Sequence, residues 1–219
     1  MPSAPGGWLE VRELSLERGP RKLLDRLAFD LSPGEALLLQ GPNGSGKSSL
    51  LRALIGLSVA TGSIRFGGET FDPASGDLCR HALYQGHASG LKGELDALEN
   101  LELAAALDGH STDAPVLRAA LATTGIGRQA ALAARRLSQG QKQRLVLARL
   151  ALANRHPSLG RPLWLLDEPS AALDRAGIAM LDDLLMVHLD RGGAAVVATH
   201  LPMLESAPAT RQPRRIELA

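Results

Sequence analysis

The nine-residue segment GPNGSGKSS, at positions 41–49, constrains the fold of this chain more than any other feature. It fits the spacing G-x-x-x-x-G-K-S/T, follows the apolar run EALLLQ and precedes the apolar-periodic stretch SSLLRALIGL. A glycine-rich loop between a buried strand and a helix wraps its backbone amides around phosphate, and the helix N-terminus adds its positive end. We expect Lys47 to contact the outer phosphates of a nucleotide and Ser48 to bind Mg²⁺. The predicted phosphate-binding residues are Gly41, Pro42, Asn43, Gly44, Ser45, Gly46, Lys47, Ser48 and Ser49.

A second apolar run, PLWLLDEPS at 162–170, ends in two acidic residues. Acids at the carboxyl end of a parallel strand lie where such sheets bind ligands. Beside a phosphate loop, Asp167 is predicted to hold Mg²⁺, and Glu168 is predicted to polarise the water that attacks the terminal phosphate. The next apolar run, AAVVATH, ends at His200, which we expect to contact the γ-phosphate. Read singly, this histidine is more often a structural hydrogen-bonding group.

Strand and helix patterns alternate along most of the chain. Strand-like runs surround WLEVRELSLERG, LLDRLAFDLSPG, EALLLQ, SIRFGGETF, LWLLD and AAVVATH. Residues from about 95 to 136 are Ala-rich and read as helical, including RQAALAARRL, and further helices are expected from 141 and over about 175–189. A purely helical stretch between strands predicts a helical lobe inserted into an α/β core.

The composition limits the partners and the compartment. The chain has 219 residues and a formal net charge of +1, so no bulk electrostatic field favours nucleic acid or an anionic membrane. Its single cysteine, Cys79, cannot form an internal disulfide, which agrees with a reducing cytosol. The first residues lack a signal-peptide pattern, and no apolar run approaches the roughly 20 residues that span a bilayer. We expect membrane contact only through a partner.

The segment RLSQGQKQR at 136–144 predicts a second anion site. Ser138 is a favourable helix N-cap, and the first turn of the helix that it begins presents unpaired backbone N–H groups. One small chain therefore carries two phosphate cradles.

Taken in order, these motifs resemble those of ATP-binding-cassette (ABC) ATPases, and the resemblance covers nearly the whole chain. LSQGQ is similar to the family signature LSGGQ, with Gln139 at its third residue, SAALD at 170–174 resembles the D-loop, and His200 matches the switch histidine. The resemblance implies a head-to-tail homodimer that binds ATP and Mg²⁺, in which one copy's phosphate loop faces its partner's signature. The signature and D-loop residues that it assigns to nucleotide binding are Ser138, Gln139, Gly140, Gln141 and Asp174.

The same resemblance implies a P-loop NTPase of the α/β class, with a RecA-like core, an N-terminal antiparallel β subdomain and an inserted α-helical lobe. It implies one ABC ATPase domain over 1–219. Residues of about 1–86 and 138–219 are expected to form the nucleotide-binding core, and residues of about 87–137 the helical signature lobe.

Two positions depart from the family pattern. The aromatic residue that commonly stacks on adenine is replaced by Arg18, whose guanidinium can stack on a base or remain a solvated charge. The usual spacing of the Q-loop glutamine falls on His87 rather than on Gln85. His87 is the favoured sensor of Mg²⁺ or of the attacking water, and Gln85 is the alternative.

The pattern G-H-x-x-G-L-K-x-x-L-x-A-L-E-N, over 86–100, resembles the ATP-binding subunits of bacterial cytochrome c maturation haem exporters. That resemblance implies an integral membrane permease as partner, a peripheral position on the cytoplasmic face of the inner membrane, and ATP use in haem delivery. The alternative is the ATP-binding subunit of another small ABC transporter. A soluble ABC protein acting on DNA or ribosomes is disfavoured, because the chain has neither a second cassette nor a strong basic patch.

Three remaining features carry no predicted function. Cys79 and His81 are interpreted as structural, and the segment NRHPSLGRP at 154–162 reads as a surface loop that is longer than the usual link. The basic tail RQPRRIEL is interpreted as a solvated terminal strand rather than as a lipid contact.

Overall fold

Two β-sheets form the scaffold of the chain, and the computed structural model describes residues 8–156 and 160–219. In the described residues, one sheet is antiparallel with strand order β2-β1-β4-β5, and the other is parallel with order β6-β7-β8-β3-β9. The antiparallel strands are β1 (Leu9–Arg18), β2 (Arg21–Leu31), β4 (Thr61–Phe66) and β5 (Glu69–Phe71). The parallel strands are β3 (Ala36–Gln40), β6 (Ala82–Gln85), β7 (Leu163–Asp167), β8 (Ala194–Ala198) and β9 (Arg214–Glu217).

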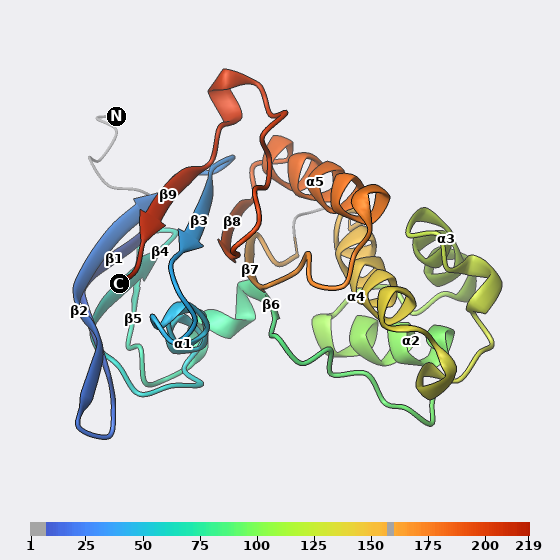
Figure 1. Cartoon of the computed structure of the whole chain (residues 1–219), viewed down its shortest axis with the longest axis horizontal. Coiled ribbons are helices and arrows are strands. Elements are labelled where there is room, and N and C mark those ends of the chain that lie inside the picture. Colours follow the sequence, from blue (N-terminus) through green and yellow to red (C-terminus); the bar gives the residue numbers. More distant parts are fainter. Residues whose placement is uncertain (1–7, 157–159) are drawn as a thin grey trace.

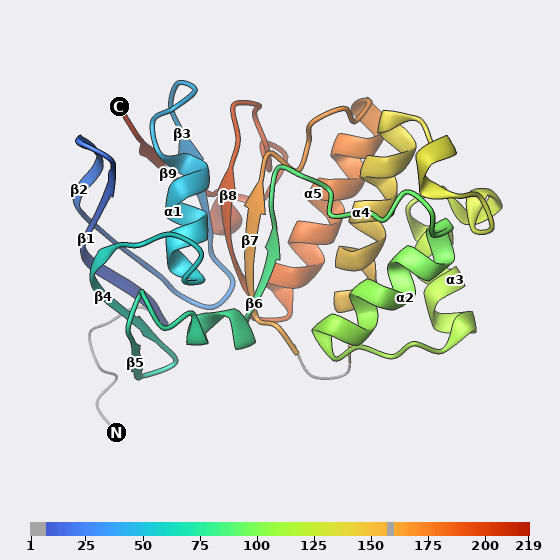
Figure 2. The ribbon, with the colours of Figure 1, turned by 90° about the horizontal axis from the view of Figure 1, so that it is seen from below.

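The helices cover both faces of the parallel sheet, with α1 on one face and α4 and α5 on the other (Figure 2). The antiparallel sheet lies at one end of the molecule, and α2 and α3 lie at the other, with the parallel sheet between them (Figures 1 and 2). The α-helices are α1 (Lys47–Leu54), α2 (Ala97–Asp108), α3 (Ala114–Thr123), α4 (Gln139–Ala153) and α5 (Arg175–Asp190). Short 3₁₀ turns cover Asp77–Arg80, Gly127–Gln129, Ala134–Arg136 and Ala209–Arg211.

The parallel strands are buried on both faces, and the alternation of their side chains separates two hydrophobic cores. Leu37 and Leu39 of β3 pack with α1 and the antiparallel sheet, whereas Leu38 between them packs with the helices of the other face. Strands β7 and β8 divide in the same way, because successive side chains of a strand point to opposite faces. Both cores are built mainly from Leu and Ala, whose apolar side chains suit a parallel sheet that is buried on both faces.

Two details differ from the sequence-based expectations. The segment RQAALAARRL was predicted to be helical, but its backbone pairs instead with the chain that leads into α2. Ala134 N donates to Leu95 O at 2.8 Å, Arg135 N donates to Gly93 O at 3.0 Å, and only short 3₁₀ turns remain. Strand β6 was missed, because its four residues acquire strand geometry by pairing with β7.

Some predicted segments meet the limits of the described residues. Residues 157–159 of the expected loop at 154–162, and residues 1–7, lie outside them. The tail does form a strand, β9, which pairs in parallel with β3. Arg214 of this strand forms an ion pair with Asp30 at 3.5 Å, so part of the basic charge of the tail is used within the fold.

A histidine is buried in the core beside the one tryptophan of the parallel sheet. The rings of His188 and Trp164 stack with centroids 3.9 Å apart, and His188 Nε2 lies 3.1 Å from Pro162 O and 3.2 Å from Ala194 O. A side chain at position 193 would place its Cβ 2.3 Å from this imidazole, which requires glycine there. Burial lowers the pKa of His188 from 6.5 to about 4, so the folded chain holds this imidazole neutral.

We expect His188 to make the chain less stable in mild acid. Below pH 6.5 the unfolded chain protonates this residue while the folded chain does not, so the free energy of unfolding falls by about 3 kcal/mol as the pH approaches 4. Urea unfolding of the native chain and of His188→Phe between pH 7 and 4 measures this contribution. The stability difference between the two should shrink by that amount. A difference that stays constant over this range would contradict the assignment.

Candidate nucleotide-binding site

The phosphate loop connects β3 to α1 in the conformation that its glycines allow. Gly41, Gly44 and Gly46 have φ of 134°, 86° and 99°, and a Cβ at position 41 would lie 2.1 Å from the carbonyl oxygen of Leu218. Lys47 begins α1 and is buried, and its Nζ donates to Gly41 O at 2.6 Å and to Pro42 O at 2.9 Å. An ammonium has three protons, so one remains for a phosphate oxygen.

A hydrogen bond joins Ser48 of α1 to Asp167 of β7. Ser48 Oγ, in the first turn of α1, donates to Asp167 Oδ1 at 2.9 Å, and Asp167 is buried at the end of β7. Hydroxyl and carboxylate oxygens are the ligands that Mg²⁺ prefers, so this pair fits the predicted metal ligands.

The next residue, Glu168, has a strained backbone. Its φ is 50°, in the left-handed region that non-glycine residues rarely adopt, and its N–H donates to Ala198 O at 2.8 Å. His200 follows β8, and its Nδ1 lies 2.8 Å from Glu168 Oε2. The carboxylate is mostly buried and the imidazole mostly exposed. Strain of this kind collects at functional sites, and here the strained residue carries the carboxylate that faces the imidazole following the adjacent strand.

The signature helix α4 begins with a complete capping box. Ser138 Oγ accepts from Gln141 N at 3.2 Å, and Ser138 N donates to Gln141 Oε1 at 2.9 Å. Ser138 and Gln139 are exposed, so the start of this helix faces outward. Among the described residues, none of 138–141 lines the cleft around Ser48 and Asp167. The structure therefore keeps the two predicted phosphate cradles of one chain apart.

The D-loop is fastened to the signature helix of the same chain. Gln143 Nε2 donates to Pro169 O at 2.7 Å, and Arg144 Nη2 donates to Asp174 Oδ1 at 2.8 Å. Asp174 is the N-cap of α5, and the hydrogen bond from Gly177 N, followed by that from Arg144, lowers the pKa of its carboxyl. The carboxylate thus stays ionised at a helix N-terminus.

Both Q-loop candidates line one cleft of about 660 Å³ that also contains Ser48 and Asp167. Gln85 ends β6 and is buried, and its Nε2 donates to Gly86 O at 2.9 Å. His87 is exposed at the rim. The geometry places both residues beside the predicted metal ligands and leaves the choice between them open.

Arg18 lies at the end of β1, exposed and opposite Arg21. The hairpin that it belongs to also contributes Leu23 and Leu24 to a cleft of about 300 Å³ beside Ser45, although Arg18 is not among the described residues that line this cleft. Its predicted contact with adenine stays a prediction.

Two further predicted structural residues lie away from these clefts. The ring of His81 packs near Phe66 and Phe71, with centroids 5.4 and 5.8 Å apart, and Cys79 is exposed with a free thiol.

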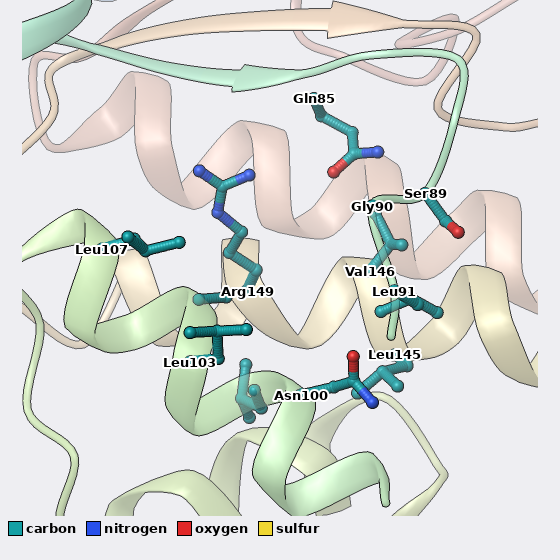
Figure 3. A pocket seen from close by; sticks show the side chains of 12 residues that line it. Gln85, Ser89, Gly90, Leu91, Asn100, Leu103, Leu107, Leu145, Val146 and Arg149 are labelled. Atoms are coloured by element: carbon teal, nitrogen blue, oxygen red, sulfur yellow. The ribbon is translucent and has the colours of Figure 1, made fainter. Parts of the chain in front are cut away.

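Sequence reasoning missed an apolar groove between α2, α4 and the chain that follows β6 (Figure 3). It has a volume of about 220 Å³, and its rim includes Leu103 and Leu107, which are 40% and 72% exposed. The sequence signal for this groove was the run LENLELAAAL, which has more leucines than one face of a helix can bury, so that some of them must be exposed. Gln85 and Arg149 line both this groove and the cleft that contains Ser48.

Comparison with known proteins gives the same assignment as these motifs. Residues 24–171 match the family model described as ABC transporter. The cytochrome c biogenesis ATP-binding export protein CcmA 2 of Cupriavidus metallidurans is 44% identical over 193 residues, which cover 88% of this chain and 89% of that protein. The protein named cytochrome c biogenesis ATP-binding export protein CcmA in Methylococcus capsulatus is 45% identical, over 84% of this chain and 86% of its own.

Solved structures show the same fold. An ATP-binding subunit of an ABC transporter superposes with a TM-score of 0.75 and 28% identity, over 89% of this chain and 80% of that one. A dimeric ATP-binding cassette, MJ0796, bound to ADP and Pi superposes with a TM-score of 0.73 and 26% identity, over 88% of each chain. The predicted P-loop fold of the α/β class is confirmed. No helix within the described residues is both long and apolar enough to cross a membrane.

The chain therefore belongs to the ABC transporter family, as an ATP-binding subunit that hydrolyses ATP, and groups with the cytochrome c biogenesis ATP-binding export proteins.

Separate replacement of the two Q-loop candidates should decide between them. We expect His87→Ala to lower ATP turnover by about 100-fold, the scale of a lost water-orienting group, and Gln85→Ala to have the smaller effect. Steady-state ATP hydrolysis by each variant measures this. Ser89→Ala is the matched control, because Ser89 lines the same cleft without a predicted role. Normal turnover in His87→Ala together with a loss in Gln85→Ala would reverse the assignment.

Proposed function

We propose that this chain is the ATP-hydrolysing subunit of an export complex that serves cytochrome c biogenesis by using ATP for haem delivery. The similarity that carries the proposal is 44% identity to a cytochrome c biogenesis export protein over 88% of the chain. The segment 86–100, whose pattern resembles this subgroup, lies beside the nucleotide cleft and contributes Gly86 and His87 to its lining.

ATP hydrolysis in this proposal uses the residues that meet at the carboxyl edge of the parallel sheet. Lys47 and the amides of the loop hold the phosphates, and Glu168 accepts a proton from the attacking water. His200, from the neighbouring strand, donates to the γ-phosphate. The Glu168–His200 contact of 2.8 Å supports a shared task for the two groups.

Ser48 and Asp167 would hold Mg²⁺ in this site, either directly or through water. Their oxygens lie 2.9 Å apart, and their chemistry suits a hard cation. When bound, Mg²⁺ would neutralise charge on the phosphates. His87, or Gln85 in its place, would contact this metal or the attacking water and so couple the nucleotide to the helical lobe.

Two copies of the chain would bind nucleotide together in a head-to-tail dimer. In this arrangement Ser138, Gln139, Gly140 and Gln141 of one copy complete the phosphate site of the other, and Asp174 of the D-loop lies at the same interface. The exposed start of α4 and its separation from the cleft of its own chain support this arrangement.

A permease subunit would dock on the groove between α2 and α4. Leu103 and Leu107 offer this partner apolar surface, and Gln85 in the wall of the groove connects it to the nucleotide cleft. The chain would then work as a peripheral protein on the cytoplasmic face of the inner membrane. The proposed division assigns about 87–137 to the lobe that meets the permease, and about 1–86 and 138–219 to the nucleotide-binding core.

Deletion of the gene should abolish covalent haem attachment to periplasmic cytochromes c. Haem staining of these cytochromes after denaturing electrophoresis measures the loss, and re-expression of the native chain should restore it. Re-expression of Lys47→Ala should not, because that variant loses the charge-assisted contacts to phosphate. Affinity purification of the chain from membranes should recover an integral membrane subunit.

Normal covalent haem in the deletion strain would exclude this function. If a membrane subunit still co-purified, the alternative of a small ABC transporter with another cargo would stand instead.

A further inference from the structure

Arg149 lines the groove on α2 (Figure 3). It also lines the nucleotide cleft, and among the described residues it is the one charged side chain that lines both. Arg149 belongs to α4, and its guanidinium lies between the leucine-rimmed groove of about 220 Å³ and the cleft of about 660 Å³ that contains Ser48. Arg149 is therefore placed to relay a change in the groove to the nucleotide cleft.

Asp108 holds this guanidinium in place. Asp108 is the last residue of α2 and its side chain is only 4% exposed, although a helix C-terminus disfavours a negative charge. Arg149 approaches it through two nitrogens, because Nε donates to Oδ2 and Nη2 donates to Oδ1 at 2.8 Å. Such a fork-to-fork contact fixes the guanidinium plane and supplies the charge that the buried carboxylate requires.

The third nitrogen of Arg149 reaches the strand that leads to the Q-loop. Its Nη1 donates to Tyr84 O at 3.0 Å, and Tyr84 immediately precedes Gln85 at the end of β6. One side chain of α4 therefore joins the end of α2 to the backbone just before the two sensor candidates.

A second arginine contacts the same carboxylate and reaches a different part of β6. Arg161 Nε lies 3.4 Å from Asp108 Oδ1, and its terminal nitrogens donate to Ala82 O at 3.0 Å and to Leu107 O at 3.1 Å. Arg161 thus ties α2 to the beginning of β6. Among the described residues, it lines neither the groove nor the nucleotide cleft.

We propose that Arg149, held by Asp108, is a positioning residue for ATP hydrolysis, which sets the end of β6 and so the placement of Gln85 and His87 against Ser48 and Asp167. A partner that presses on the groove moves α2, Asp108 moves with it, and Arg149 carries the displacement to the Tyr84 carbonyl. Arg161 has only a structural role in this proposal, because it holds α2 to the start of β6. The inference rests on the proposed sensing role of the segment 85–87.

The test compares Arg149→Lys with Arg161→Lys in the full-length chain. Each variant keeps a positive charge near Asp108, but an ammonium cannot reproduce the flat three-nitrogen contact of a guanidinium. Arg149→Lys should lower kcat for ATP about tenfold or more, as small misplacements in active sites do, with the KM for ATP within about twofold. Arg161 has the same carboxylate partner, but Arg161→Lys should leave kcat within about twofold of the native value. This should hold even if Arg161→Lys lowers the melting temperature as much as Arg149→Lys does.

Equal losses of kcat in the two variants, in step with their melting temperatures, would show a purely structural junction and overturn the inference. If Arg149→Lys kept the native kcat while His87→Ala or Gln85→Ala lost turnover, the inference would be overturned and the proposed function would stand. If Arg149→Lys, His87→Ala and Gln85→Ala all kept the native kcat, both the sensing role of 85–87 and the inference that rests on it would be overturned.

Discussion

The hydrogen bond between Ser48 and Asp167 joins the two segments on which the whole site depends. Ser48 follows the loop after β3, and Asp167 ends β7, with β8 between these strands in the sheet. Because parallel strands end at one edge, the loop, the two acids and His200 after β8 arrive at the same place. The two hydrophobic cores fix these strands from both faces, so the spacing of the site is set by the sheet and not by flexible loops.

The rest of the molecule extends from that edge in two directions. Gln143 and Arg144 fasten the signature helix to Pro169 and Asp174, so Ser138 keeps a fixed relation to the acids of its own chain. On the other side, Asp108 and its two arginines fasten α2 to β6. Around this sheet the chain thus presents a phosphate loop, the exposed helix start at Ser138 and an apolar groove on α2 and α4. In the proposed complex, the second copy would use the first two surfaces and the membrane partner the third.

The sequence predicted those parts whose chemistry is local. The phosphate loop, the acidic strand end and the capped signature helix are each encoded within about ten residues, so their spacing alone predicts their geometry. Strand β6 escaped notice because ALYQ becomes a strand through β7, some eighty positions away. RQAALAARRL was wrongly expected to be helical, since its Ala-rich composition says nothing of backbone bonds to Leu95 and Gly93. The junction of Asp108 with Arg149 and Arg161 joins three distant charges, and no local pattern relates them.

The central claim is that nucleotide is bound between two copies of this chain, with the loop of one facing the signature of the other. Its most direct test uses two chains in the Cys79→Ser, Glu168→Gln background, one with Asn43→Cys and one with Gln139→Cys, both at exposed positions. Mixed together with their membrane partner and ATP, and treated with a short thiol cross-linker, they should give a covalent heterodimer. Without ATP, or in chains that also carry Lys47→Ala, the yield should fall sharply. If ATP-saturated complexes gave no cross-linked heterodimer, the account of a shared nucleotide site would be contradicted.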